Sequence, residues 1–302
     1  MTATGWFAGC LLAALCCCLG ATPARCAQPL LGKADVGAIK AFVLSDGYRE
    51  MDAKLLLADT PDKQEAVKAA YPDGKTLNSL NVLLFKSGDR VVLVDTGGGK
   101  ILGPGAGGLP KAMDEAGVKP EAVTDIVLTH LHRDHTGGLG LDGKAAYPNA
   151  TVYLSKAEYD YWLNPDNEAK APERARSTFT TAREMLALYP GKVQTFEPGK
   201  ELLPGATPLA AYGHTPGHIA LLLSSNGQNL LFFADLLHAM GLQLPRPDIA
   251  IAFDTDPAQA VQARKALLER AAKEGWTVTG VHVPGPETYK IKASGQGFEL
   301  VK

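Results

Sequence analysis

The feature that most constrains this 302-residue chain is a cluster of metal-ligating residue types within six positions: His130, His132, Asp134 and His135. The cluster follows an apolar segment that ends at Thr129 and that predicts a buried strand. If strand geometry continued, two of the imidazoles would leave the same face. Imidazole and carboxylate together favour zinc or a similar divalent ion. Four such donors exceed what one tetrahedral site needs beside distant ligands, so the spacing predicts two adjacent metal ions.

Further candidate donors lie much later in the chain. His214 is in a Gly- and Pro-rich turn between two expected strands, and Asp235 and His282 each end an apolar strand. Strand ends that converge on one edge of a sheet commonly form a site, so we expect these side chains to join the cluster. His218, four residues after His214, is predicted to have a supporting role beside the ligands. His238 could line the mouth of the site or face solvent. Arg133, inside the cluster, is predicted to be a solvated turn residue.

The first residues of the chain predict export. Gly5–Ala21 is uncharged and apolar, and small residues and Pro23 follow it, as in a signal peptide. The segment before it lacks Lys and Arg, so an uncleaved membrane anchor is the alternative. We therefore expect a signal peptide at residues 1–27, a periplasmic or secreted protein, and no stable membrane association after cleavage. All five cysteines lie at or before Cys26, which excludes a disulfide framework in the mature chain.

Composition indicates an ordinary globular protein. Hydrophobic residues make up 46% of the chain, and 30 Lys plus Arg against 32 Asp plus Glu give a net charge of −2. These values exclude a collagen, a coiled coil or wholesale disorder, and they argue against nucleic-acid binding, which needs a basic face. We expect a single domain over residues 28–302 that acts on a small molecule. The sequence leaves a homodimer open.

Short β-rich segments alternate irregularly with helical ones, which predicts a mixed α/β (α+β) fold of two helix-covered sheets rather than a doubly wound sheet. The expected strands include Ala41–Leu44, Val82–Phe85, Val91–Asp95, Ile126–Thr129, Thr151–Leu154, Val193–Phe196, Ile219–Leu223, Leu230–Phe233 and Val278–His282. The expected helices are Leu109–Ala116, Lys156–Trp162, Ser177–Tyr189 and Pro257–Glu274. Gly97–Pro110 and Asn164–Pro172 are expected to be loops, and Phe85–Arg90 to close a hairpin.

The motifs together resemble the metallo-β-lactamase superfamily. His-x-His-x-Asp-His, then Gly-His-Thr-Pro-Gly-His, a later Asp and a last His carry the likeness, which runs from about Ser45 to the C-terminus. Val94–Gly97, Ala146–Asn149, Asp254–Asp256 and His282–Pro284 bring the chain nearest to the exported methyl parathion hydrolase and lactonase-like branch. The resemblance implies an αββα sandwich with two metal ions at one edge. The chain departs from that branch at Gly285, where an aromatic is usual, and at Lys290, where a second His is usual.

Carried over residue by residue, the resemblance implies a complete set of seven ligands. The first ion would be held by His130, His132 and His214, the second by Asp134, His135 and His282, and both by Asp235. Zinc is the first choice, with manganese, cobalt or iron as alternatives. Asp134 would also be catalytic, by orienting the nucleophile or carrying its proton. Asp95 could accept the second ring N–H of a ligand histidine, or it could be a turn residue.

The resulting prediction is an exported hydrolase in which a hydroxide shared by two metal ions cleaves small neutral esters, namely lactones or aryl esters. Phosphotriester hydrolysis is an expected side activity, because it needs the same nucleophile and Lewis acid. The alternatives are a glyoxalase-type thioester hydrolase, a β-lactam hydrolase of the same fold, and a metal-binding protein without turnover. The aromatics Tyr159, Tyr161 and Trp162 could wall an apolar pocket, but their helical spacing is more typical of core.

Overall fold

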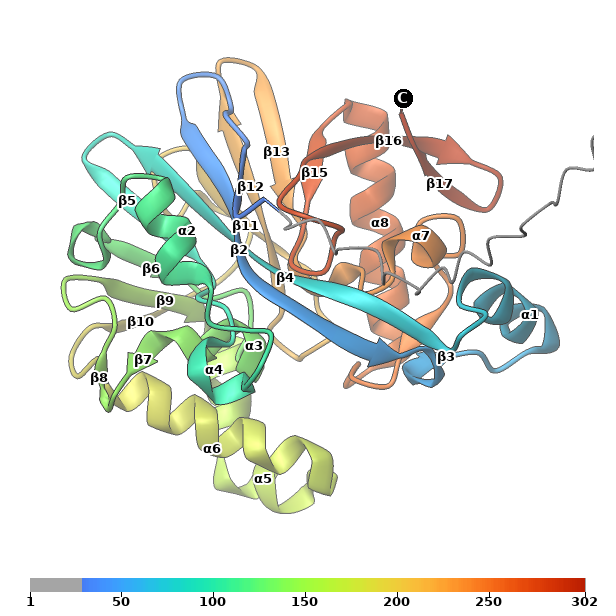
Figure 1. Ribbon diagram of the computed structural model, residues 1–302, viewed down its shortest axis with the longest axis horizontal. Helices are drawn as coiled ribbons and strands as arrows, with labels where there is room; N and C mark the ends of the chain where they lie inside the picture. Colours follow the sequence, from blue (N-terminus) through green and yellow to red (C-terminus); the bar gives the residue numbers. More distant parts are fainter. Residues whose placement is uncertain (1–28, 302) are drawn as a thin grey trace, which may run out of the picture.

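Two facing β-sheets with helices on their outer faces form a four-layer αββα sandwich (Figure 1). The computed structural model describes residues 29–301, so the predicted signal peptide at residues 1–27 lies outside the described residues. The mixed α/β class predicted from the sequence is confirmed. Within residues 29–301, no helix has the length and apolar character needed to cross a membrane.

The first sheet has seven strands and is mixed. Its spatial order is β1 (Leu31–Lys33), β2 (Lys40–Asp52), β4 (Lys75–Ser87), β5 (Arg90–Val94), β6 (Asp125–Val127), β9 (Thr151–Ser155) and β10 (Val193–Phe196). The strands β1, β2, β4 and β5 pair antiparallel, whereas β5, β6, β9 and β10 pair parallel. The predicted hairpin at Phe85–Arg90 is confirmed, because β4 and β5 pair across it.

The second sheet has six strands. Its order is β11 (Ala206–Ala210), β12 (Ile219–Ser225), β13 (Gln228–Phe232), β15 (Thr277–Thr279), β16 (Tyr289–Ser294) and β17 (Gly297–Leu300). Two small pairs complete the strands, β3 (Leu56–Leu57) with β14 (Ala250–Ile251) and β7 (Gly140–Leu141) with β8 (Lys144–Ala145).

Eight α-helices and five short 3-10 helices lie within residues 29–301. The α-helices are α1 (Pro61–Ala70), α2 (Leu109–Glu115), α3 (Arg133–Thr136), α4 (Lys156–Leu163), α5 (Pro165–Lys170), α6 (Glu173–Ala187), α7 (Met240–Gln243) and α8 (Pro257–Glu274). The 3-10 helices are η1 (Ala53–Leu55), η2 (Gly99–Leu102), η3 (Pro120–Ala122), η4 (Gly137–Leu139) and η5 (Ala234–Leu236).

Alternation along the strands explains why the sheets stack. On β4, Val82 and Leu84 pack beneath α2, α4 and α6, whereas Leu83 and Phe85 point between the two sheets. Because successive side chains of a strand leave opposite faces, a strand that is apolar at every position must be covered on both sides. Strand β12 divides its side chains in the same way between the inter-sheet core and the core beneath α8.

Helix α8 has the predicted bounds Pro257–Glu274. The carboxylate of Asp256 accepts a hydrogen bond from the backbone N–H of Gln259, and Pro257 occupies the first turn, where its missing N–H costs nothing. Gly275 ends the helix at φ 66°, a left-handed conformation that glycine adopts without a Cβ clash. The capping residues at both ends therefore made the bounds of this helix predictable from the sequence.

One predicted loop is wrong. Asn164–Pro172 was expected to be irregular, but α5 occupies Pro165–Lys170. The side chain of Asn164 accepts a hydrogen bond from Asp166 N–H at 2.9 Å, and Pro165 begins the helix. The polar, proline-bounded composition therefore reflects a capped surface helix rather than a loop. The next helix, α6, also begins earlier than predicted, at Glu173 instead of Ser177.

Four predicted strands end earlier than expected, and this changes how the candidate ligands are held. Strand β5 ends at Val94, β6 at Val127, β13 at Phe232 and β15 at Thr279. His130 and His132 are therefore not on a continuing strand, so strand alternation does not explain their common direction. His130 lies in the segment after β6, Asp235 in the short 3-10 helix η5 after β13, and His282 in a turn after β15. The ligand directions are instead fixed by turns and side-chain hydrogen bonds.

Candidate metal centre

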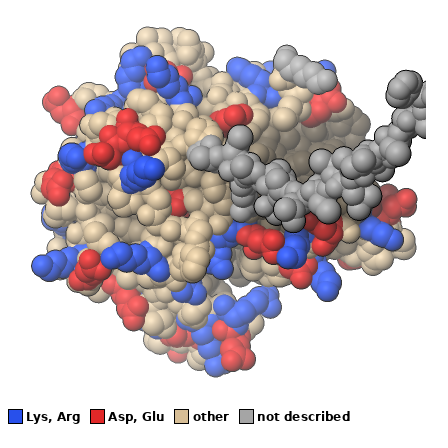
Figure 2. Space-filling view, viewed as in Figure 1, with Lys and Arg blue, Asp and Glu red and all other residues tan. Residues whose placement is uncertain are grey.

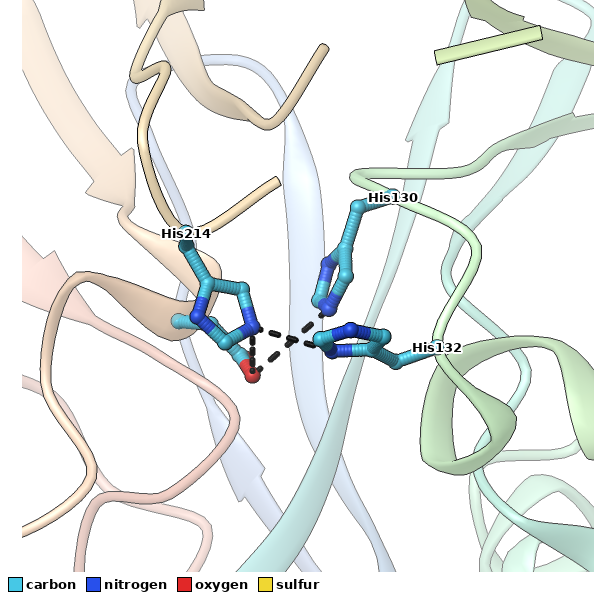
Figure 3. A group of neighbouring side chains, drawn as sticks. His130, His132 and His214 are labelled. Atoms are coloured by element: carbon cyan, nitrogen blue, oxygen red, sulfur yellow. Dashed lines mark hydrogen bonds and ion pairs between the residues drawn. The ribbon is translucent and has the colours of Figure 1, made fainter. Parts of the chain in front are cut away.

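All seven predicted ligands come together at one edge of the sandwich. The first group consists of His130, His132, His214 and Asp235, whose donor atoms lie within 4.8 Å of one another. Figure 3 shows the three imidazoles turned toward one another and toward a carboxylate oxygen, which is Oδ2 of Asp235, 3.3 Å from His214 Nε2 and 3.7 Å from His130 Nε2. His132 Nδ1 lies 3.0 Å from His214 Nε2.

A second group adjoins the first through Asp235. It consists of Asp134, His135 and His282, again with donor atoms within 4.8 Å of one another. Asp235 Oδ1 lies 3.2 Å from His135 Nε2, and Asp235 Oδ2 lies 3.2 Å from His282 Nε2. Asp235 thus faces both groups, which is the arrangement that a bridging carboxylate requires.

Strained backbone at two strand ends aims two of the carboxylates. Asp95, directly after β5, has φ 65°, and Ala234, directly before Asp235, has φ 49°. Left-handed conformations are unfavourable for residues with a Cβ, and they persist where the surrounding structure fixes them, often at functional sites. At Asp95 the fixing contacts are visible, because its carboxylate accepts from Thr129 N–H and from Thr129 Oγ1–H, both at 2.8 Å.

Three imidazoles of the cluster are oriented by a hydrogen bond from the ring nitrogen that faces away from it. His135 Nδ1–H donates to Asp95 at 2.8 Å and His214 Nδ1–H donates to Asp254 at 2.9 Å. His282 Nδ1–H donates to the carbonyl oxygen of Ser79 at 2.9 Å. These bonds aim Nε2 of the three rings at the cluster, as a metal ligand requires. Asp95 therefore accepts the second ring N–H of a candidate ligand histidine, which is the first of the two roles predicted for it.

His218 is not a candidate ligand, because both of its ring nitrogens form hydrogen bonds to backbone atoms. Its Nδ1–H donates to the carbonyl oxygen of Ala211 at 2.8 Å, and its Nε2 accepts from the backbone N–H of Asp235 at 3.3 Å. Burial lowers the pKa of His218 to about 3, which keeps the ring neutral and able to accept that bond. His218 thus holds the backbone of Asp235 in place.

Glu158 joins the two loops that carry the histidines, a role that sequence reasoning missed. Its fully buried carboxylate accepts four hydrogen bonds, from Leu131 N–H (2.9 Å), Trp162 Nε1–H (2.6 Å), Thr215 Oγ1–H (2.7 Å) and Gly217 N–H (2.9 Å). Leu131 lies between His130 and His132, while the last two donors flank the turn after His214. A single glutamate in a helical segment gives no sequence signal of this connection.

The electrostatics of the cluster fit a cation. Burial opposes ionisation of Asp235, but the surrounding imidazoles, His135 foremost, hold the pKa of its carboxyl well below the usual range. Burial lowers the pKa of His132 to about 3. His214 is different, since contact with Asp235 and Asp254 outweighs burial and raises its pKa to about 9. A divalent ion would replace the proton on such a ring and neutralise the carboxylates.

The donor set also passes a direct test of fit. Three buried atoms that face the cluster have no hydrogen-bond partner among residues 29–301: His130 Nε2, His135 Nε2 and Asp235 Oδ1. Leaving buried polar atoms unpaired is costly, so such a concentration needs a ligand. Five imidazoles and two carboxylates are a donor set that zinc and related first-row ions prefer. The residues present therefore fit two divalent ions.

The cluster forms the floor of a pocket of about 450 Å³. His238, which sequence left open between site and solvent, lines this pocket and is buried, with Nε2 3.1 Å from Asp235 Oδ2. Its ring stacks on His282 with centroids 4.8 Å apart. Apolar side chains line part of the wall, among them Met51, Leu55 and Phe253.

One expectation about the surroundings is wrong, and another is confirmed for two of its three residues. Arg133 is not a fully solvated turn residue, because it is half-buried and lines the pocket. The aromatics after β9 do not wall the pocket. Trp162 is buried in the core beneath the first sheet, Tyr161 packs against that core, and Tyr159 is exposed. The core interpretation of Tyr161 and Trp162 is therefore the correct one.

Comparison with known proteins identifies the class. A model of the metallo-β-lactamase superfamily matches residues 76–282, which is more than half of the chain. The chain belongs to the metallo-β-lactamase superfamily, as the motifs and the αββα architecture indicate.

Individual relatives are lactonases and hydrolases. An N-acyl homoserine lactonase of Bacillus cereus is 30% identical over 132 residues, which is 41% of this chain and 45% of the relative. The chain therefore spans about half the length of this curated relative. Among solved structures, hydrolase AbOPH of the beta lactamase superfamily is 31% identical with a TM-score of 0.83, and AidC, a dizinc quorum-quenching lactonase, is 28% identical with a TM-score of 0.81. Each match covers 90% of this chain and 96% of the other.

Proposed function

We propose that this protein is a metal-dependent hydrolase that uses two divalent ions, zinc first, to cleave small lactones or aryl esters. The observation that carries the proposal is the convergence of seven donors, three of them with unpaired buried atoms, at the floor of one pocket. The similarity to lactonases supports the substrate class. We also propose that the protein is exported, and the apolar N-terminal run is the only support for this. We propose that it binds no nucleic acid, and the near-neutral net charge is the only support for that. On the face seen in Figure 2, acidic and basic side chains lie interspersed.

The proposed ligands divide as the donors do. His130, His132 and His214 would hold one ion, Asp134, His135 and His282 the other, with Asp235 between them. When bound, such ions polarise the reacting carbonyl oxygen and bring the pKa of water toward neutrality.

The chain's own residues handle the proton and the substrate. Asp134 lines the pocket with its side chain 26% exposed, whereas Asp235 beside it is buried. Burial opposes ionisation of Asp134, but His135 and His282 lower the pKa of its carboxyl, so it is an acceptor at neutral pH. Asp134 can thus take a proton from water and return it to the leaving alkoxide. The apolar wall excludes water around the substrate.

A substrate panel tests the proposal. Purified protein is assayed with an aryl lactone, an N-acyl homoserine lactone, an aryl phosphotriester, a β-lactam and a glutathione thioester. We expect turnover of the lactones that a chelator abolishes and added zinc restores. Preferred turnover of the thioester or the β-lactam would move the protein to one of the alternative branches. Two bound ions without turnover of any substrate would support a metal-binding protein instead.

A further inference from the structure

We propose that the pocket binds a substrate carrying a negatively charged oxyacid group, a carboxylate or a phosphate, through Arg133, Arg174 and Arg49. This inference rests on the proposed hydrolase function and narrows its substrate class. It departs from the neutral esters expected from the sequence.

Three arginines from three separate elements line one pocket. Arg49 lies on β2, Arg133 on α3 beside the metal centre, and Arg174 on α6. Each donates to one backbone carbonyl oxygen: Arg49 to Leu102 (3.4 Å), Arg133 to Ile101 (3.1 Å) and Arg174 to Ala252 (3.1 Å). A guanidinium has five N–H donors, so each of the three keeps several donors available.

These three arginines have no acidic partner within residues 29–301, and the same is true of Arg176 and Arg264. The other four arginines in that range form ion pairs with carboxylates at 2.6–3.0 Å: Arg90, Arg183, Arg246 and Arg270. The acidic residues of the pocket are occupied in other ways. Glu50 pairs with Lys75 at 2.7 Å, the carboxylate of Asp52 accepts from Lys54 N–H at 2.8 Å, and the other two face the histidines.

Arg133 gives the strongest indication of a missing ligand. It lies between His132 and Asp134 in the chain, and its Nε is buried without a hydrogen-bond partner in the described part of the chain. A buried N–H without an acceptor is costly, and an oxyanion in the pocket would supply the acceptor. The planar guanidinium matches the two oxygens of a carboxylate or phosphate, and charge-assisted bonds of this kind are the strong ones.

The geometry of the pocket suggests how such a substrate would lie. Its scissile carbonyl would sit over Asp134 and Asp235 on the floor, and its charged group would reach the arginines on the wall. A short aliphatic linker between them would contact Met51 and Phe253, which also line the pocket. An ester or lactone with an acidic substituent a few bonds from the reacting carbonyl meets this description.

Matched substrates test the charge directly. Three para-nitrophenyl carboxylate esters of the same chain length are compared. The glutaric acid monoester carries a terminal carboxylate, the 4-phosphonobutyric acid ester carries a terminal phosphonate, and the pentanoic acid ester is neutral. We expect the wild type to favour at least one charged ester over the neutral one by roughly tenfold or more in kcat/KM. Arg133→Gln and Arg174→Gln should each reduce this ratio severalfold. The ratio is insensitive to metal loading, because the same enzyme sample turns over both esters.

Arg176→Gln is the matched control, since Arg176 is exposed on the same helix α6 and does not line the pocket. It should leave the ratio unchanged. Chelator-sensitive turnover with a ratio near one in the wild type would overturn the anion site while leaving the hydrolase proposal intact.

If no ester is hydrolysed, the hydrolase proposal fails and the anion site is tested by binding. Calorimetry with the corresponding para-nitroanilides should then show tighter binding of the charged compound, lost in Arg133→Gln. Equal binding of charged and neutral anilides would overturn the inference.

Discussion

The candidate metal centre and the pocket above it differ in how their side chains are held in place. The centre consists mostly of buried side chains, and most of its rings have a second hydrogen bond that fixes their direction. The pocket wall comes from β2, η2, α6 and the segment around Phe253, and much of it is exposed. A centre fixed by its own bonds keeps one chemistry, whereas walls on separate surface segments can change without disturbing it. The comparison teaches that reaction type and substrate choice are set by different parts of this fold.

The most severe way to break the centre is Asp235→Ala. Because Asp235 faces both donor groups, we expect loss of bound metal and a fall in kcat/KM well beyond the roughly 100-fold that supporting residues account for. Circular dichroism should show that the fold persists. Metal analysis and lactone turnover check the prediction, and normal activity with two ions bound would contradict the bridging role.

Glu158→Gln tests whether the centre depends on the connection between its loops. The glutamine amide group would face backbone and side-chain donors, so at least one bond is lost. We expect zinc affinity to fall by about tenfold and the free energy of unfolding by about 2 kcal/mol. Competition with a chromophoric chelator and urea unfolding measure the two effects. Glu184→Gln, an exposed change on α6, is the control, and equal values for both variants would exclude the role.

The state of His214 predicts how metal binding depends on pH. Its pKa is about 9 in the metal-free protein, so the ring carries a proton at neutral pH that a metal ion must displace. Apparent affinity should therefore rise with pH, by about tenfold per unit for this proton, and level off above about pH 9. Zinc titrations in buffers of different ionisation enthalpy count the released protons. Affinity that falls with rising pH would contradict the assignment.

The smallest loss of activity is expected from a substitution in the pocket wall. Phe253 is 41% exposed and lines the pocket, so Phe253→Ala removes part of an apolar contact with substrate. We expect kcat/KM for an aryl lactone to fall by about fivefold, mainly through KM, while metal content stays at the wild-type value. Loss of metal in this variant would show that wall and centre are not separable.

The same division explains what could be predicted from sequence. The seven side chains that meet at the candidate centre were predictable. Four are close in sequence around His130, Asp235 and His282 each end a predicted apolar strand, and His214 lies in a Gly- and Pro-rich turn between strands. The directions of their side chains were not, since strands end earlier than the pattern suggests and turns aim the rings. The α8 boundaries were predictable from caps at Asp256 and Gly275.

The wall could not be predicted, because its residues meet only through tertiary structure. Arg174 lies in a first helical turn that the pattern missed, and Arg133 looked like a solvated turn residue. Neither position carries a local signal that distinguishes a pocket from open solvent. Three of the four buried hydrogen bonds of Glu158 are invisible for the same reason, since their donors lie 27 to 59 residues away.

The most direct test of the central claim is anomalous diffraction at the zinc edge from crystals of the zinc-loaded protein. The account predicts two neighbouring peaks, one among His130, His132 and His214, the other among Asp134, His135 and His282, with Asp235 between them. No peak in this cluster, or zinc bound elsewhere on the molecule, would contradict it.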